Sequence, residues 1–239
     1  MSTVRYGTIE YRGDHGLRGR ERWSISLDED GTKTLVAHCR MFDTRVERWV
    51  VHTVDARMRP VRSFVSHRRQ GRFLGEGRFW FEPGLLSGHT HVHDRGVLHQ
   101  QVRIDGEADY FVPHAVAGDS WITPACERHG DWQEIRHGYT SSLLPDGSTG
   151  PLIEHHEGLR IRFVGDEDVR VPAGEFATAH FVVSARPGVE EHLWVTQDEF
   201  VMLVRLRSDR LATTYVLTEL AEEAGWPTVA TDQRAEADR

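Results

Sequence analysis

The segment WSISL at residues 23–27 places an apolar side chain at every second position, and the cluster Asp28-Glu29-Asp30-Gly31 follows it. This spacing is typical of a β-strand with one buried face and one exposed face. A glycine at the end of such a cluster can adopt the positive φ of a tight turn. The segment therefore predicts a strand that leads into a hairpin.

Outward from this segment, the alternating pattern and the turn residues recur along most of the chain. Further strands are predicted at residues 34–42, 46–54, 60–67, 72–81, 86–93, 98–104, 108–112, 159–164, 168–171, 176–183, 192–195, 200–206 and 212–220. Such a series predicts an all-β fold, in which a large curved antiparallel sheet forms a barrel or half-barrel with a central cavity. Only residues 218–224 favour a short helix.

The domain organisation that we predict is simple. Residues 1–226 are expected to form a single β-barrel-like domain, because no linker rich in Ser, Pro or Gly divides them. Residues 227–239 are polar and predict a flexible tail. Residues 114–131 and 141–151 lack the strand pattern, so we expect them to be loops, where functional residues often lie.

Composition narrows the classes of function. The 239 residues carry a formal net charge of −8, which disfavours nucleic acid as a partner. The two cysteines do not form a disulfide framework, and the first residues lack the apolar run of a signal peptide. No apolar stretch is long enough to span a membrane. A cytoplasmic location is therefore expected, and exposed edge strands favour a homodimer.

The segment Val171-Pro172-Ala173-Gly174-Glu175-Phe176-Ala177-Thr178 resembles a VPAGxFxT signature, and the strand pattern around Leu193-Trp194-Val195 follows it. Residues 165–220 thus resemble the DUF3108-type family, whose members are similar to the half-barrel of lipoprotein-sorting factors. The resemblance implies a wide, curved sheet that cups an apolar ligand. It implies no catalytic residue.

Histidines on one predicted strand suggest a metal site. His89, His91 and His93 would project from the same face, with neighbouring Cα atoms about 6.5–7 Å apart. His89 and His91 could therefore share one Zn²⁺, with Asp94, His99 or a distant histidine as further ligands. The alternative is a solvated strand face, because Val92 supplies the apolar contact on the opposite side.

The loop after residue 112 contains candidates for acid–base catalysis. His114 and Asp119 could meet across one turn, where the carboxylate would orient the imidazole. Trp121 could form an aromatic wall beside them. The alternatives are that Asp119 is a cap or turn residue and that Trp121 fills the core.

A third histidine lies in the strand predicted at residues 176–183. His180 either points into the cavity as a neutral base or is a core histidine with a hydrogen-bond partner. Phe176 of the same strand is assigned to the ligand pocket. Tyr139 and Ser141 could supply hydroxyl groups to a ligand, although they could equally be edge-strand residues.

No Walker loop, GxSxG elbow, GxGxxG turn or HExxH helix occurs in the sequence. The leading hypothesis is therefore a cofactor-free lyase, hydratase or isomerase acting on a small hydrophobic or aromatic molecule. His114, Asp119 and His180 would be the catalytic residues. The alternatives are a non-catalytic carrier of an apolar ligand and a metal-dependent enzyme that uses a zinc ion at His89 and His91.

Overall fold

The computed structural model describes residues 3–144, 146–147, 149–186 and 188–224. The described elements of the first half are β1 (Thr3–Gly13), β2 (Gly16–Leu27), β3 (Lys33–Met41), β4 (Val46–Val54), β5 (Pro60–Arg69), β6 (Arg72–Glu82), β7 (Leu85–Val92), β8 (Gly96–Arg103), β9 (Tyr110–Val112) and the 3₁₀-helix η1 (Val116–Ala125). Those of the second half are β10 (Gln133–Glu134), β11 (Gly138–Thr140), β12 (Glu154–His155), β13 (Arg160–Val171), β14 (Gly174–Arg186), β15 (Val189–Thr196), β16 (Leu203–Ser208) and β17 (Thr213–Ala224).

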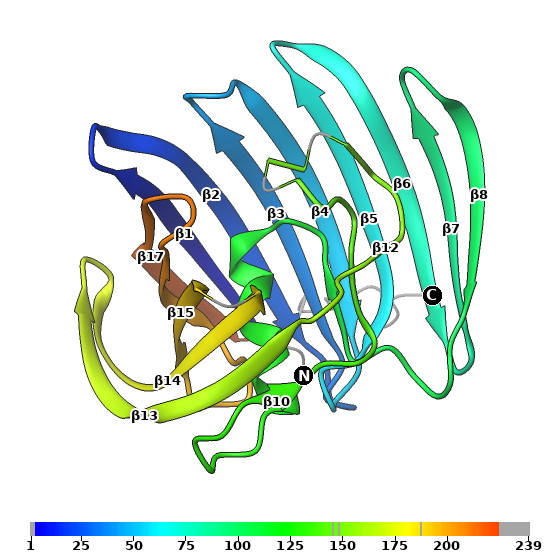
Figure 1. The fold of residues 1–239 in the computed structure, drawn as a ribbon. Coiled ribbons are helices and arrows are strands. Elements are labelled where there is room, and N and C mark those ends of the chain that lie inside the picture. Colours follow the sequence, from blue (N-terminus) through cyan, green and yellow to red (C-terminus); the bar gives the residue numbers. More distant parts are fainter. Residues whose placement is uncertain (1–2, 145, 148, 187, 225–239) are drawn as a thin grey trace, which may run out of the picture.

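One antiparallel sheet of 14 strands dominates the molecule, in the order β10-β13-β14-β15-β16-β17-β1-β2-β3-β4-β5-β6-β7-β8 (Figure 1). The first and last strands of the chain pair with each other near its centre, from Thr3 opposite Ala224 to Gly13 opposite Thr213. A small second sheet has the order β12-β11-β9, with β9 and β11 parallel. The all-β class and the antiparallel sheet predicted from the alternation are confirmed.

The large sheet curves strongly, but β8 and β10 lie at its two ends and do not pair. The part of the prediction that allowed a closed barrel is therefore wrong. The strands β1–β8 form one wing of the sheet and β13–β17 form the other, and both face η1 (Figure 1). A long strand on each wing accommodates this curvature with a bulge, between Tyr11 and Arg12 in β1 and between Phe163 and Gly165 in β13.

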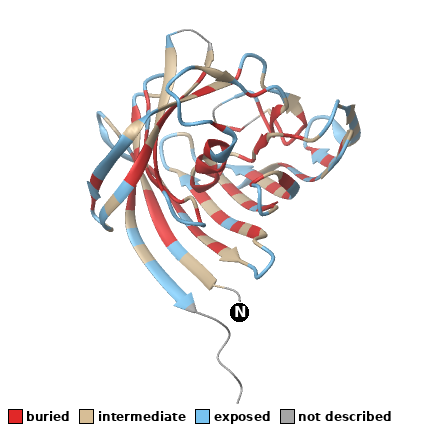
Figure 2. Ribbon diagram, turned by 90° about the horizontal axis from the view of Figure 1, so that it is seen from below, coloured by how far each residue is buried: buried red, intermediate tan, exposed pale blue. Residues whose placement is uncertain are grey.

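Burial alternates along the strands, as the sequence pattern predicts (Figure 2). In β3, Leu35, Ala37 and Cys39 are buried against the core, whereas Val36 and Arg40 are exposed. The buried side faces η1, and the alternate side chains form the outer face of the sheet. Strands such as β3 thus give one side to the core and the other to solvent.

The chain itself fills the inner side of the sheet. Residues 104–159 cross it, and η1 contacts β2, β3, β15 and β16. Trp121 of η1 is 1 % exposed and donates a hydrogen bond from Nε1 to the Phe200 carbonyl at 3.2 Å. A Cβ at Gly77 of β6 would lie 3.1 Å from Pro151, so glycine allows this inner segment to approach the sheet closely. The predicted central cavity thus coincides with a region that the protein fills with its own side chains.

Two local predictions are wrong. Residues 218–224 are not a helix but the end of β17, which pairs with β1. Residues 116–125, expected to be a loop, form η1. The predicted tail at 227–239 lies outside the described residues. No helix among the residues that the structure describes is long and apolar enough to cross a membrane.

Candidate functional site

His114, the first predicted catalytic residue, lies between β9 and η1 with a positive φ of 62°. Its Nε2 lies 2.8 Å from the Ser142 carbonyl and 3.2 Å from Thr140 Oγ1. A carbonyl only accepts, so His114 Nε2 carries the hydrogen and donates. Burial, and then the nearby Arg48, lower the pKa of His114 to about 3. The ring is therefore neutral and holds the 140–142 segment in place.

Asp119 and His114 have different hydrogen-bond partners among the described residues. Its Oδ1 accepts a long hydrogen bond of 3.4 Å from the Tyr110 hydroxyl. Burial, and then the charges of Glu191 and Glu21, raise the pKa of Asp119 well above its usual value. Asp119 on η1 thus faces other acidic groups rather than an imidazole.

His180, the third predicted catalytic residue, lies on the outer face of β14, because its neighbours Ala179 and Phe181 belong to the core. Its Nε2 is 3.0 Å from His192 Nδ1, and its ring stacks on Trp194 with 4.4 Å between centroids. Burial, and then His192, lower the pKa of His180. Among the described residues, no hydrogen bond or ion pair joins any two of His114, Asp119 and His180.

The predicted ligand-binding residues are also dispersed. Trp121 is a core residue, and Tyr139 is buried in β11 with its ring 5.2 Å from that of His155. Ser141 is fully buried, and its hydroxyl has no hydrogen-bond partner in the part of the chain that the structure describes. Phe176 is half-buried on β14. The structure therefore brings these four residues to no common pocket.

The predicted metal ligands His89 and His91 are exposed on the outer face of β7. The ring nearest to His89 is that of His99 on β8, with centroids 4.4 Å apart, and His91 lies against Phe73. No group of three or more His, Cys, Asp or Glu side chains within the described ranges is placed to hold a metal ion. Geometry thus favours the solvated strand face over a three-ligand zinc site.

A buried polar cluster fixes η1 to the sheet. Glu21 is fully buried in β2, and its carboxylate accepts hydrogen bonds from the Val116 and Ala117 amides at 2.8 and 2.9 Å. The Tyr11 hydroxyl and the Cys39 thiol donate to the same carboxylate at 2.8 and 3.2 Å. A carboxylate with four donors, two of them at a helix N-terminus, is well satisfied. This cluster is structural, because its acceptor sites are occupied.

A second buried cluster anchors the inner loops. Arg48 of β4 donates from Nε to His67 Nε2 at 2.8 Å, from Nη2 to the Asp146 carbonyl at 2.5 Å, and from Nη1 to the His114 carbonyl. An acceptor nitrogen must be unprotonated, so His67 is neutral, and burial lowers its pKa well below the usual value. Arg48 thus donates the hydrogen bonds that solvent would otherwise supply to backbone carbonyls with no strand partner.

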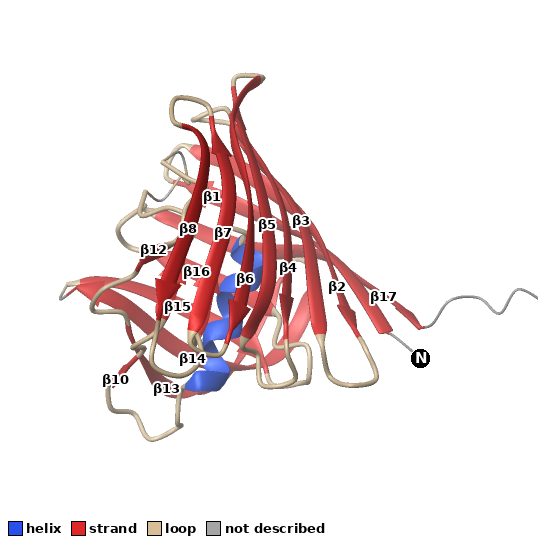
Figure 3. Ribbon diagram, turned by 90° about the vertical axis from the view of Figure 1, so that its right-hand side faces the viewer, coloured by secondary structure: helices blue, strands red, loops and turns tan. Residues whose placement is uncertain are grey.

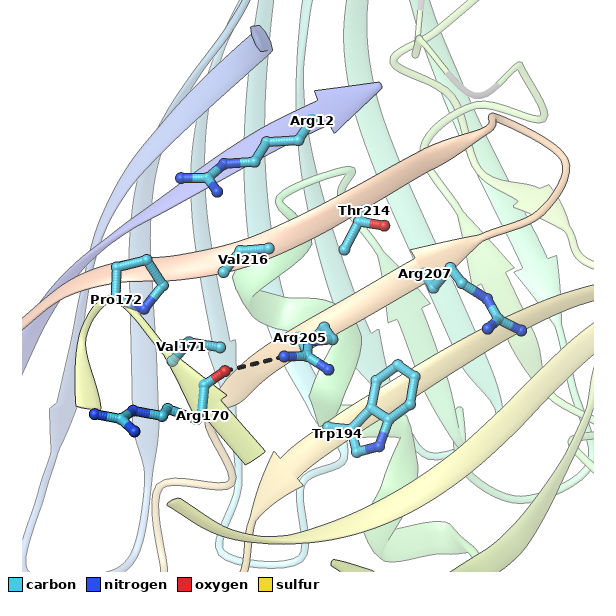
Figure 4. A pocket seen from close by; sticks show the side chains of 9 residues that line it. All are labelled: Arg12, Arg170, Val171, Pro172, Trp194, Arg205, Arg207, Thr214 and Val216. Carbon is cyan, nitrogen blue, oxygen red and sulfur yellow. Dashed lines mark hydrogen bonds between the residues drawn. The ribbon is translucent and has the colours of Figure 1, made fainter. Parts of the chain in front are cut away.

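A site that the sequence did not reveal lies on the outer face of the other wing (Figure 4). There, a cleft of about 540 Å³ is formed by β1, β13, β15, β16 and β17. We call it the arginine cleft, and it is lined by Arg12, Arg170, Val171, Pro172, Trp194, Arg205, Arg207, Thr214 and Val216. In Figure 4 these side chains stand in front of the strands while η1 lies behind them, so the cleft is separated from the core by the sheet.

The floor of the arginine cleft is apolar. Val171, Trp194 and Val216 are each less than 10 % exposed. They come from three strands, and the turn after β13 brings Pro172 beside them (Figure 4). Arg205 Nη2 donates to the Arg170 carbonyl at 3.0 Å, which holds the end of β13 against β16. This floor has the apolar lining of ordinary small-molecule sites, and its volume is within their range.

The rim of the cleft is cationic. Arg205 lies 5.6 Å from the Trp194 ring. Arg207 is ion-paired to Asp209 at 3.1 Å, and Arg12 to Glu10 at 2.9 Å. Arg170 is exposed, and its guanidinium makes no ion pair within the described residues. None of the nine lining residues is acidic, and the Glu167 carboxylate beside them accepts a hydrogen bond from Trp194 Nε1. Four arginines around one hollow, in a chain of net charge −8, create a local positive field that attracts anions.

The sequence contains one signal for this site that local pattern reading passes over. Arg205 and Arg207 flank Leu206 in a strand, so both guanidinium groups leave the same face. Trp194 on the neighbouring strand and Arg12 at the far end of the chain join them only through strand pairing. The pairing of β1 with β17 is the part that no local pattern discloses.

The fold and the cleft define an all-β protein with a large, open antiparallel sheet and an arginine-rimmed hollow on its outer face. No protein-family model and no curated protein matches the chain, so the resemblance to the DUF3108-type family stays a prediction. Among solved structures, the chain is similar to a β-barrel-like protein of the domain of unknown function DUF1849 from Brucella abortus. The TM-score is 0.50, the identity is 10 %, and 93 % of this chain and 98 % of that one are covered.

A second solved structure with which the chain aligns is a Bacteroides fragilis protein of YmcC-like fold. Its TM-score is 0.35 and its identity 8 %, over 92 % of this chain and 95 % of that one. At these identities the likeness to the Brucella protein concerns the fold alone.

Proposed function

We propose that this protein is a binding protein whose ligand is a small amphiphilic anion held in the arginine cleft. The observation that carries the proposal is the combination of an apolar floor with four arginines and no acidic lining residue in a hollow of about 540 Å³. Guanidinium groups bind phosphate and carboxylate groups in bidentate fashion. The floor would accommodate the apolar part of the same molecule.

The proposal retains the carrier alternative but moves its ligand from the inner side of the sheet to the outer one. The inner side is occupied by residues 104–159, whereas the cleft is open to solvent. Acid–base chemistry by His114, Asp119 and His180 stays a prediction. His180 is the member of that set beside the cleft, since it stacks on Trp194.

The proposal is tested by calorimetric titration with dodecyl phosphate below its micelle concentration. Inorganic phosphate and dodecyl maltoside serve as the polar and uncharged comparisons. Dodecyl phosphate is expected to bind at least about tenfold more tightly than either, because it alone uses both floor and rim. The double variant Arg170→Gln with Arg207→Gln should weaken it by about a hundredfold, since each of the two lost charge-assisted contacts contributes about 1.5 kcal/mol.

The matched control removes two exposed arginines elsewhere, by Arg95→Gln with Arg136→Gln. This control should bind dodecyl phosphate like the parent protein, and both double variants should keep its melting temperature. The proposal would be wrong if the cleft variant and the parent bound dodecyl phosphate equally tightly. It would also be wrong if the parent bound dodecyl maltoside as tightly as dodecyl phosphate.

A further inference from the structure

The outer face of the first wing carries a second surface, distinct from the arginine cleft. Strand register places its side chains in four rows across β2–β6, on the face turned away from η1 (Figure 3). We call them the outer rows. They are Ser24-Val36-Val51-Phe64-Arg78, Arg22-His38-Trp49-Ser66-Glu76, Ser26-Thr34-Thr53-Arg62-Trp80 and Arg20-Arg40-Glu47-Arg68. In Figure 3 no helix or loop crosses this face, and η1 lies behind it.

Apolar side chains gather at the centre of the outer rows. Val36 and Val51 are opposite each other on neighbouring strands and are 48 % and 37 % exposed, and Phe64 continues the same row. Trp80, in the adjoining row, is 39 % exposed. The wet face of an antiparallel sheet is normally polar. A contiguous group of exposed apolar residues on such a face marks an interaction surface.

Arginines surround this apolar centre. The outer rows contain six arginines and two glutamates. Arg20 is paired with Glu10 of β1 at 2.9 Å, and Glu47 accepts from His38 at 2.8 Å. Arg68 lies 5.6 Å from the Trp49 ring, so its stem covers apolar surface while its charge stays at the edge. The face is therefore positive although the whole chain is negative.

The geometry points to a bilayer surface that contains anionic lipid as the partner of the outer rows. Trp and Arg side chains are suited to the level of the headgroups, where an apolar body meets a polar layer. Neither of the two described clefts is lined by residues of the outer rows. A second copy docking through the same face would bring like charges together. Anionic headgroups neutralise them.

The test is flotation of the full chain with phosphatidylcholine vesicles, with and without phosphatidylglycerol. The parent protein should float only with the anionic vesicles, and high salt should release it because the attraction is screened. The triple variant Arg62→Gln, Arg68→Gln and Arg78→Gln should reduce partitioning by about a hundredfold, at about fivefold per arginine. Val36→Thr with Val51→Thr, which keeps the β-branched shape, should reduce it by about tenfold.

Three outcomes would overturn the inference: no flotation, equal flotation with both kinds of vesicle, or unchanged flotation of the triple variant. The control of equal charge is Arg95→Gln, Arg136→Gln and Arg210→Gln, which are exposed away from the outer rows and should leave flotation unchanged. The cleft variant Arg170→Gln with Arg207→Gln separates the two proposals. If it alone abolishes flotation, the vesicle is bound through the cleft and the outer rows have no part.

Discussion

At the scale of single residues, buried ionisable groups tie the inner segment to the sheet. Glu21 takes part in four hydrogen bonds from three elements, and Arg48 reaches three acceptors that lie far apart in the sequence. Removing one partner of such a cluster destabilises the protein by more than the net contribution of the lost hydrogen bond, because the remaining groups stay buried and unpaired. These residues are therefore expected to dominate stability more than the exposed ion pairs do.

The variant Glu21→Gln tests this expectation. It places an amide NH₂ where only donors converge, so the free energy of unfolding should fall by about 2 kcal/mol or more. Glu47→Gln, on the outer face, should change it by less than about 0.5 kcal/mol. Urea unfolding measures both values. Equal effects of the two substitutions would show that the Glu21 cluster is not a main anchor of η1.

Stability should also fall as the solution is acidified from about pH 7 to about pH 5.5. Burial lowers the pKa of His52 to about 4 and that of His114 to about 3. Below the ordinary histidine value of about 6.5, protons bind to the unfolded chain but not to these folded rings, which favours unfolding. The loss continues until the folded pKa values are reached.

The variant His52→Leu removes one ring that binds a proton in the unfolded chain but not in the folded protein. The dependence of the unfolding free energy on pH should therefore become shallower by up to about 1.4 kcal/mol per pH unit. His93→Asn, at an exposed position, should keep the dependence of the parent protein. Denaturant unfolding at several pH values measures the slopes. A slope unaffected by His52→Leu would contradict a neutral buried ring.

At the scale of elements, sequence pattern predicted the strands well and the special elements poorly. The strand alternation in β3–β7 follows directly from one buried face. Residues 218–224 are rich in Leu, Ala and Glu, which favour helix locally, yet pairing of Thr3–Thr8 with Glu219–Ala224 holds them in β17. The helix η1 contains Gly118 and Pro124 and owes its N-terminal caps to Glu21, almost a hundred residues earlier.

The same reasoning explains what could be predicted of the site. The outward direction of Arg205 and Arg207 follows from the strand period alone. Their assembly with Trp194, Arg170 and Arg12 depends on register between strands that are distant in the chain. His114, Asp119 and His180 were linked by residue type, whereas the structure places them on different elements with separate partners.

At the scale of the whole molecule, one continuous sheet joins both wings through β1 and β17. We therefore expect a single cooperative unfolding transition, because neither wing can lose its central strand alone. Far-ultraviolet circular dichroism reports the whole sheet, and tryptophan fluorescence reports side chains on both wings, from Trp49 to Trp194. The two signals should give the same midpoint. Two separated transitions would show that the wings unfold as independent units.

The pairing of the first strand with the last also constrains synthesis on the ribosome. The edge of β1 that faces β17 stays without its partner until about 200 further residues have been translated, which takes roughly 10–40 s at about 5–20 residues per second. During that time its free amides and carbonyls can pair with any nascent strand nearby. Because β2 pairs with the opposite edge of β1, this edge stays open to other strands until the last strand emerges.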